Sequence, residues 1–112
     1  MIDNHLFAKR LRAARLMKAQ RLGFKTARGY SQERLGIDAG IEEESASPRI
    51  NQYEHGKRLP DLGTAARLAA VLEVPMAYLF CPEDDLADLL LAAFRLSPRA
   101  RKELAKATAD RK

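Results

Sequence analysis

Signals that start helices recur at short intervals along this chain. Serine or a proline stands just before successive apolar runs, at Ser31, Ser47-Pro48, Pro60-Asp61 and Ser97-Pro98. Serine and aspartate side chains accept hydrogen bonds from the free N–H groups at a helix start, and proline tolerates the first helical position. Between these signals, apolar residues recur at three- and four-residue spacings, and no alternating run competes as a strand. The chain is therefore predicted to be all-α.

Five helices are expected within residues 1–81, which we predict to form one domain. Residues 82–112 are expected to add one or two C-terminal helices, of which the last frays or acts as a basic tail. Glycine and proline are expected to end or separate the helices at Gly40, Gly56 and Val74-Pro75. The five expected helices cover residues 3–20, 31–40, 47–55, 60–72 and 76–80.

The charge of the chain is unevenly distributed. The formal net charge is +5, and both ends are basic: residues 1–30 hold eight Lys or Arg against Asp3 alone. Acidic clusters at residues 42–44 and 83–88 lie between the two basic ends. A basic face indicates a polyanionic partner, most commonly nucleic acid, although the charges could equally serve only to solvate helices.

Several classes of protein are disfavoured by what the chain contains. Two isolated histidines, His5 and His55, and a single cysteine, Cys81, offer no catalytic triad, no metal-ligand spacing and no disulfide framework. The N-terminus lacks the layout of a signal peptide, and no apolar stretch is long enough to span a membrane. We therefore expect a soluble, cytoplasmic protein that is not an enzyme and has no metal or cofactor, with Cys81 in the core.

Two motifs occur in order and carry a family resemblance. The first is Ser31-Gln32-Glu33-Arg34-Leu35, and the second runs from Ile50 through Tyr53-Glu54 to Gly56-Lys57. Together they resemble the lambda-repressor/Cro-like helix-turn-helix regulators, also called the xenobiotic-response-element family, over roughly residues 5–81. The resemblance implies a five-helix domain that binds double-stranded DNA, with residues 47–55 as the recognition helix in the major groove.

The expected DNA-reading residues lie mainly on that third helix. Ile50 and Tyr53 are three residues apart and should face the core, which turns the polar side chains of the same helix toward other faces. The resemblance implies base contacts from Ser47, Pro48 and Gln52, a phosphate contact from Gln32, and backbone contacts from the loop that follows the helix. The complete predicted DNA-binding set is Gln32, Ser47, Arg49, Asn51, Gln52, Lys57 and Arg58, with solvated loop charges as the alternative for the last two.

An ion pair between two helices is also implied by the resemblance. Arg15 and Glu54 match a pair that joins the first helix to the recognition helix in related proteins, where it sets the angle of that helix. The alternative is that the two side chains are unrelated surface charges.

The chain departs from the family pattern in two places near the reading surface. The link between Arg15 and Gly29 is longer than usual, so either the first helix extends toward Leu22 or a basic loop projects. The turn from Gly40 to Ile50 is also expected to be longer and to contain Glu42–Glu44. These carboxylates would repel phosphate unless they point away or stabilise the start of the recognition helix.

The leading hypothesis is a sequence-specific transcriptional regulator, a repressor that binds a palindromic operator as a homodimer. Dimer contacts are expected from an apolar face on residues 86–94, although that face could instead pack on its own domain. The residues of this face are Leu86, Leu89, Leu90 and Phe94. The alternative function is a protein-interaction module on the same fold, such as an antitoxin that binds a protein partner. No residue distinguishes a phage repressor, a restriction-modification controller and an antitoxin.

Overall fold

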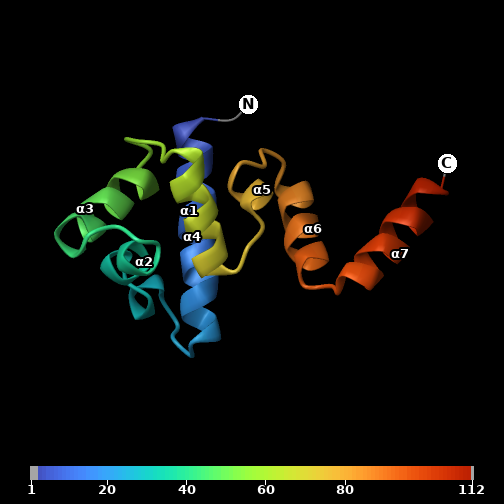
Figure 1. Cartoon of the computed structure of the whole chain (residues 1–112), viewed down its shortest axis with the longest axis horizontal. Helices are drawn as coiled ribbons and strands as arrows, with labels where there is room; N and C mark the ends of the chain where they lie inside the picture. Colours follow the sequence, from blue (N-terminus) through green and yellow to red (C-terminus); the bar gives the residue numbers. More distant parts are fainter. Residues whose placement is uncertain (1–2, 112) are drawn as a thin grey trace.

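The structure, a computed structural model that describes residues 3–111, contains seven α-helices and one short 3-10 turn in that range and no strand. The all-α prediction is confirmed. Figure 1 shows α4 in front of α1 in the middle of the molecule, with α2 and α3 at one end and α6 and α7 at the other. The helices are α1 (Asn4–Arg21), α2 (Gln32–Asp38), α3 (Glu43–Glu54), α4 (Leu62–Leu72), α5 (Met76–Leu79), α6 (Asp84–Phe94) and α7 (Pro98–Ala109), and the 3-10 turn η1 is Ala27–Gly29.

Side-chain caps define the starts of three helices where the sequence predicts them. Ser31 accepts a hydrogen bond from the Arg34 N–H at 3.0 Å, and the equivalent bond to Ser97 opens α7 at 3.1 Å. Asp61 caps α4 by accepting from the Thr64 N–H at 2.7 Å. Hydrogen bonds to Thr64 hold the pKa of the Asp61 carboxyl below its ordinary value, because they favour the charged form.

The third helix begins one turn earlier than predicted. The expected start at Ser47 was wrong, because α3 begins at Glu43 and contains Pro48 in its second turn. Ala46 is fully buried, so the first turn of α3 is part of the core and not of a surface loop. Pro48 has no N–H to donate to the Glu44 carbonyl oxygen, but both residues are exposed, so water can bond to that oxygen instead. Tertiary packing therefore decides where this helix starts.

The core forms where α1 crosses the helices on either side of it. Cys81 is buried, as predicted. The aromatic rings of Phe7 and Phe80 lie 5.2 Å apart between their centroids and join α1 to the residue that follows α5. Fully buried large apolar side chains come from α1 to α5 and are Phe7, Leu11, Leu35, Ile50, Leu68, Leu72 and Leu79.

The extra residues after Arg15 mostly extend the first helix, which is one of the two expected alternatives. Helix α1 continues to Arg21, and the loop that follows contains η1 before Tyr30. Arg21 donates to the Leu72 carbonyl oxygen at 2.8 Å and lies 3.5 Å from the Glu73 carboxylate, so it caps the end of α4. Of the basic residues in this region, Lys25 and Arg28 are exposed in the loop.

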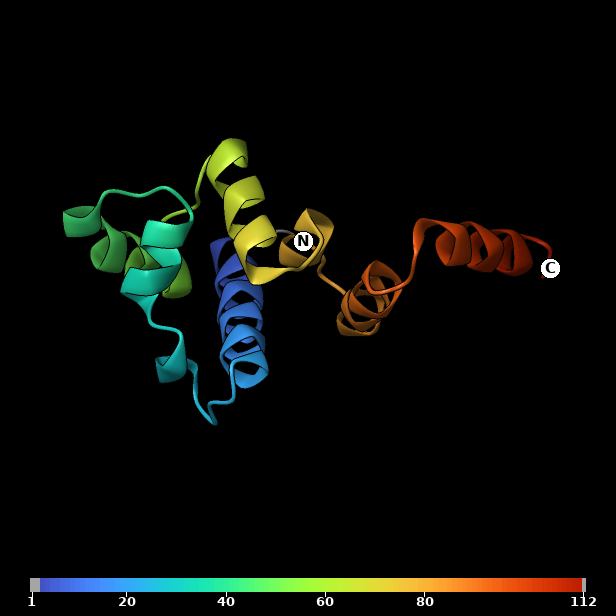
Figure 2. The ribbon, with the colours of Figure 1, turned by 60° about the horizontal axis from the view of Figure 1, so that its bottom comes forward.

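The two C-terminal helices differ in how many of their side chains are buried. Helix α6 places Ala87 in the core and packs Leu90 and Leu91 against it, so the core continues past residue 81. Helix α7 has no buried residue and extends away from the rest of the molecule (Figure 2). Among residues 3–111, no helix is both long and apolar enough to cross a membrane.

Candidate nucleic-acid interface

Helices α2 and α3 form a closely packed pair at one end of the molecule (Figure 1). A Cβ atom added to Gly36 on α2 would lie only 2.6 Å from the Cβ of Ala46 on α3, so this position accommodates glycine alone without a shift. The Ile41 N–H donates to the Gly36 carbonyl oxygen at 2.9 Å and closes the turn that follows α2. The two helices are thereby held in one fixed orientation.

Helix α3 has a core face and an exposed face. Ile50 and Tyr53 are buried, as the sequence predicted, together with Ala46. The exposed residues Glu44, Pro48 and Gln52 succeed one another at four-residue spacing, which places them along one line of the helix. His55 follows Gln52 by three residues, is exposed, and lies next to the same line. This line of side chains is the surface that α3 presents outward.

A buried carboxylate anchors α3 to α1. Arg15 donates from Nε to Glu54 Oε2 at 2.6 Å and from Nη2 to Glu54 Oε1 at 2.9 Å. Arg15 Nη1 also donates to the carbonyl oxygens of Ala27 and Tyr30, each at 2.9 Å, and so ties down the loop before α2. Glu54 is only 2% exposed, and Arg12 donates to its backbone carbonyl oxygen. The pair therefore connects α1, the loop and the end of α3.

Gln32 extends this network toward the exposed surface. Its Nε2 donates to Glu54 Oε1 at 3.0 Å, and its Oε1 accepts from Asn51 Nδ2 at 3.4 Å. In the free protein the Gln32 amide thus orients Asn51 and helps to satisfy the buried carboxylate. The predicted phosphate contact of Gln32 is not tested by this geometry and stays a prediction.

The opposite flank of α3 faces the start of α4. Arg49 lines a polar cavity of about 370 Å³ together with Thr64 and Arg67. Arg67 is held in place because it donates to the Ala39 carbonyl oxygen at 2.9 Å and to Thr64 Oγ1 at 3.0 Å. The remaining predicted residues are Ser47, half-buried on α3, and Lys57 and Arg58, exposed just after it.

The acidic residues near the turn occupy the start of α3. Glu43 and Glu44 lie in its first turn, and all three carboxylates of residues 42–44 are exposed. Negative charge is favourable at a helix N-terminus because the backbone N–H groups there carry partial positive charge. The acidic run therefore stabilises the longer α3. Within residues 3–111, no group of three or more His, Cys, Asp or Glu side chains could hold a metal ion.

Three residues on or beside the exposed face of α3 were not identified as such from the sequence. Glu44 was expected in the turn before the third helix and not on the helix itself, because its place depends on where α3 begins. His55 could have been found from its three-residue spacing to Gln52. Arg67 had no signal in the sequence, since its proximity to Arg49 arises only from the packing of α4 on α2.

Comparisons with known proteins agree with this geometry. The helix-turn-helix family matches residues 11–79. A solved structure described as the transcriptional regulator BswR is 45% identical to this chain, with a TM-score of 0.73, and the match covers 91% of each chain. A search of curated proteins finds no match. The chain therefore belongs to the helix-turn-helix family of Cro/C1-type DNA-binding regulators and carries two further C-terminal helices.

Proposed function

We propose that this protein is a sequence-specific transcriptional regulator that inserts α3 into the major groove of double-stranded DNA. The observation that carries the proposal is the exposed line of Glu44, Pro48, Gln52 and His55 on a helix whose other face is locked into the core. The major groove is about 12 Å wide and admits one α-helix, whose side chains then reach the base edges. What supports the proposal is a helix fixed on the core whose outer face carries the exposed polar side chains of Gln52 and His55.

Gln52 is the proposed principal base reader. A glutamine amide pairs with adenine through one donor and one acceptor, and Gln52 is exposed near the middle of the outer line. Asn51 and Arg49 lie on opposite flanks of α3, where they would meet the edges of the groove. Lys57 and Arg58 follow the helix and would contact phosphates.

The proposed regulator acts as a homodimer and represses the gene next to its operator. One recognition helix contacts too few base pairs for strong discrimination, so a palindromic site read by two copies is the natural arrangement. The apolar residues predicted for dimer contact divide between two places on α6. Leu86, Leu89 and Leu90 line a groove between α6 and α7, whereas Phe94 lies beside Arg101 at the end of α6.

The experiment that tests this proposal is selection from a random duplex library at roughly physiological salt, where sequence-specific binding outlasts phosphate contacts. The expected result is an inverted repeat with half-sites about one helical turn apart. A reporter gene placed behind that repeat should be transcribed less when the protein is present. Binding without any enriched sequence would contradict the proposal.

A pair of matched variants then tests the role of α3. Gln52→Ala should weaken binding to the selected site by about tenfold or more, since a good bidentate base contact discriminates by about 1–3 kcal/mol. Gln20→Ala removes the same side chain from an exposed position near the end of α1 and should bind as the wild type does. Equal losses of binding affinity in the two variants would show that Gln52 does not contact the bases.

The second candidate function is a protein-interaction module, and one observation favours it. Glu43, Glu44 and Pro48 occupy the exposed start of α3, and none of them can donate a side-chain hydrogen bond to a base or a phosphate. An antitoxin-like module would use this acidic surface on a basic protein partner. Two results together would favour this function. No DNA sequence is enriched, and a basic protein partner binds the wild type but not a variant that carries both Glu43→Gln and Glu44→Gln.

A further inference from the structure

Helix α7 lacks a surface to pack against within its own chain. It is 12 residues long and has no buried residue, and Leu104 is 45% exposed. Isolated helices of about this length are marginal in water, because helix stability in proteins comes mostly from packing an apolar face. A stable α7 therefore needs a partner surface.

An open apolar groove lies between α6 and α7. The two helices diverge as a V, and their inner faces enclose a groove of about 580 Å³ lined mostly by apolar side chains. Leu86 and Leu89 on α6 are 45% and 57% exposed, and Leu104 lies opposite them on α7. The opposite face of α6 is already used, because Ala87 is fully buried in the core. The inner face of the V remains uncovered.

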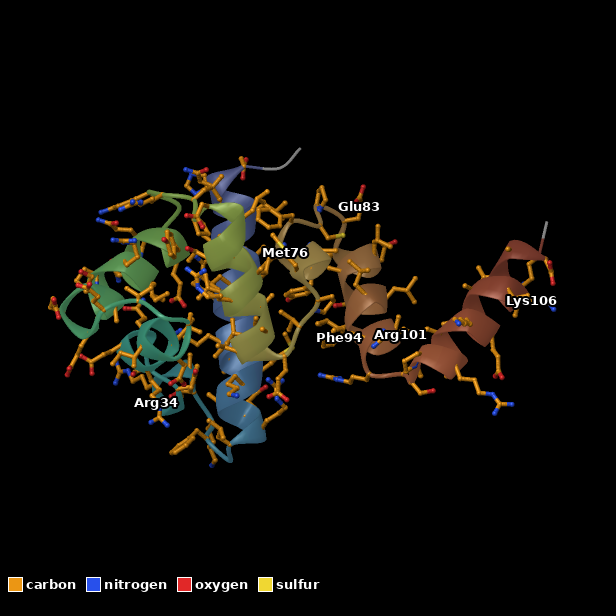
Figure 3. The ribbon with its side chains drawn as sticks, viewed as in Figure 1. Arg34, Met76, Glu83, Phe94, Arg101 and Lys106 are labelled. Atoms are coloured by element: carbon orange, nitrogen blue, oxygen red, sulfur yellow. The ribbon has the colours of Figure 1, made fainter. Side chains whose placement is uncertain are left out.

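Arg101 anchors α7 at the closed end of the V. Its Nε and Nη2 donate to the carbonyl oxygens of Ala93 and Phe94 at 3.1 and 2.9 Å, and its guanidinium lies 5.7 Å from the centroid of the Phe94 ring. Figure 3 shows Phe94 and Arg101 together at this end, with Glu83 and Lys106 farther out on the two arms. The contact joins α7 to the last carbonyl groups of α6 and leaves the mouth of the V open.

The two arms carry opposite charge. Helix α6 begins with acidic residues, and α7 is rich in Lys and Arg. Among residues 3–111, the ion pairs of these helices are those of Asp84 with α1 and of Arg99 with Glu103, so Asp85 and Lys102 have no ion-pair partner. Asp85 lies one turn before Leu89, and Lys102 lies three residues before Ala105 of the groove. Each apolar inner face therefore has a charge beside it, negative on α6 and positive on α7.

We propose that a second copy of this chain occupies the groove, with α7 of each copy lying in the V of the other. Leu104 of one copy packs on Leu86 and Leu89 of its partner, and Lys102 lies beside Asp85. This proposal deepens the homodimer of the proposed function by naming the helix that pairs the two copies.

Self-complementarity identifies the occupant as a second copy and not another protein. One chain supplies both the apolar groove with its acidic edge and the basic helix with its apolar stripe, which is what a twofold interface requires. The interface would lie at the opposite end of the molecule from α3 (Figure 1). Both reading helices would remain accessible to DNA.

The test is the mass of the full chain in solution by sedimentation velocity, at roughly 1 to 100 µM protein. The wild type should sediment with twice the chain mass of 12.5 kDa. Leu89→Glu and Leu104→Glu should each weaken association by about 100-fold or more, because each places a charge in an apolar interface. Both side chains are exposed in the single chain, so helical circular dichroism should show that the variants still fold.

Matched controls place the same change outside the groove. Ala92 on α6 and Ala107 on α7 are exposed and do not line the groove, so the variants Ala92→Glu and Ala107→Glu should remain dimers. Asp85→Lys should weaken association, and adding Lys102→Glu to the same chain should restore it. A monomeric wild type at the highest concentration would overturn the proposal, as would a dimer that survives both leucine changes.

The outcome is separable from DNA reading. Gln52→Ala should leave the association unchanged, because Gln52 lies on α3. If Leu104→Glu yields monomers while no DNA site is enriched, the pairing stands and the DNA-reading proposal fails. If a site is enriched but the leucine variants still dimerise, the pairing proposal fails alone.

Discussion

Arg15 and Glu54 form a bidentate ion pair, with Nε–Oε2 and Nη2–Oε1 distances of 2.6 and 2.9 Å, and the carboxylate is almost completely buried. The pair joins α1 to the last residue of α3, and Gln32 adds a further donor to the same carboxylate at 3.0 Å. A buried carboxylate is costly unless all its acceptors are satisfied. This network therefore fixes the orientation of α3 relative to α1.

Removing the cation should destabilise the fold. We expect Arg15→Gln to lower the free energy of unfolding by about 3 kcal/mol, because it leaves the Glu54 charge buried without its partner. Urea unfolding followed by circular dichroism measures the change. Arg34→Gln is the control, since the Arg34–Asp38 pair is largely exposed at 3.5 Å and should contribute less than about 1 kcal/mol. Equal losses would show that Arg15 contributes no more than a surface charge.

The close approach of α2 and α3 gives a second prediction. Gly36→Ala should destabilise the protein by about 1–3 kcal/mol, because the new methyl group would lie 2.6 Å from the Ala46 Cβ and 2.9 Å from its Cα. Adding Ala46→Gly should recover part of the loss by making room. Gly63→Ala meets nothing closer than 3.6 Å and should be neutral or slightly stabilising, since alanine favours the helix. Thermal melting of the three variants and the wild type decides between these outcomes.

Phosphate contacts after α3 should appear in the salt dependence of DNA binding. We expect Lys57→Gln and Arg58→Gln each to reduce the slope of log K against log salt concentration by about 0.9, which corresponds to one phosphate contact. Arg95→Gln removes a charge at the end of α6, at the opposite end of the molecule from α3 (Figure 1), and should keep the wild-type slope. Fluorescence anisotropy on the selected site gives the slopes. Unchanged slopes in all three variants would exclude the loop from the interface.

The link between α1 and α6 should weaken in acid. Hydrogen bonds from Lys9 and Arg10 hold the pKa of the Asp84 carboxyl below its ordinary value. A lowered pKa in the folded state stabilises the fold at pH values above the ordinary value of about 3.9, and this contribution is lost as the pH falls through the lower folded value. The difference in unfolding free energy between wild type and Asp84→Asn should therefore be constant near neutral pH and shrink below about pH 4. A difference that does not change with pH would contradict the assignment.

Local chemistry made much of the fold predictable. The caps at Ser31, Asp61 and Ser97 were found because capping depends on residues within one helical turn. The burial of Ile50 and Tyr53 followed from their spacing on one helix. The all-α class and the family followed from these local signals and from two motifs that occur together in the chain.

Residues distant in the sequence settled the features that were missed. Helix α3 starts at Glu43 because Ala46 packs against Gly36, and the Ser47-Pro48 signal could not reveal that contact. Gln32 is turned toward Glu54 and Asn51, and Arg49 lies near Arg67, because α2, α3 and α4 meet around them. The leucines of α6 divide between the core and an open groove for the same reason. Helix type and side-chain capping depend on neighbours within one turn, so the sequence alone determines them. The start of a packed helix such as α3, its side-chain partners and its exposed face depend on which distant surfaces exclude water together.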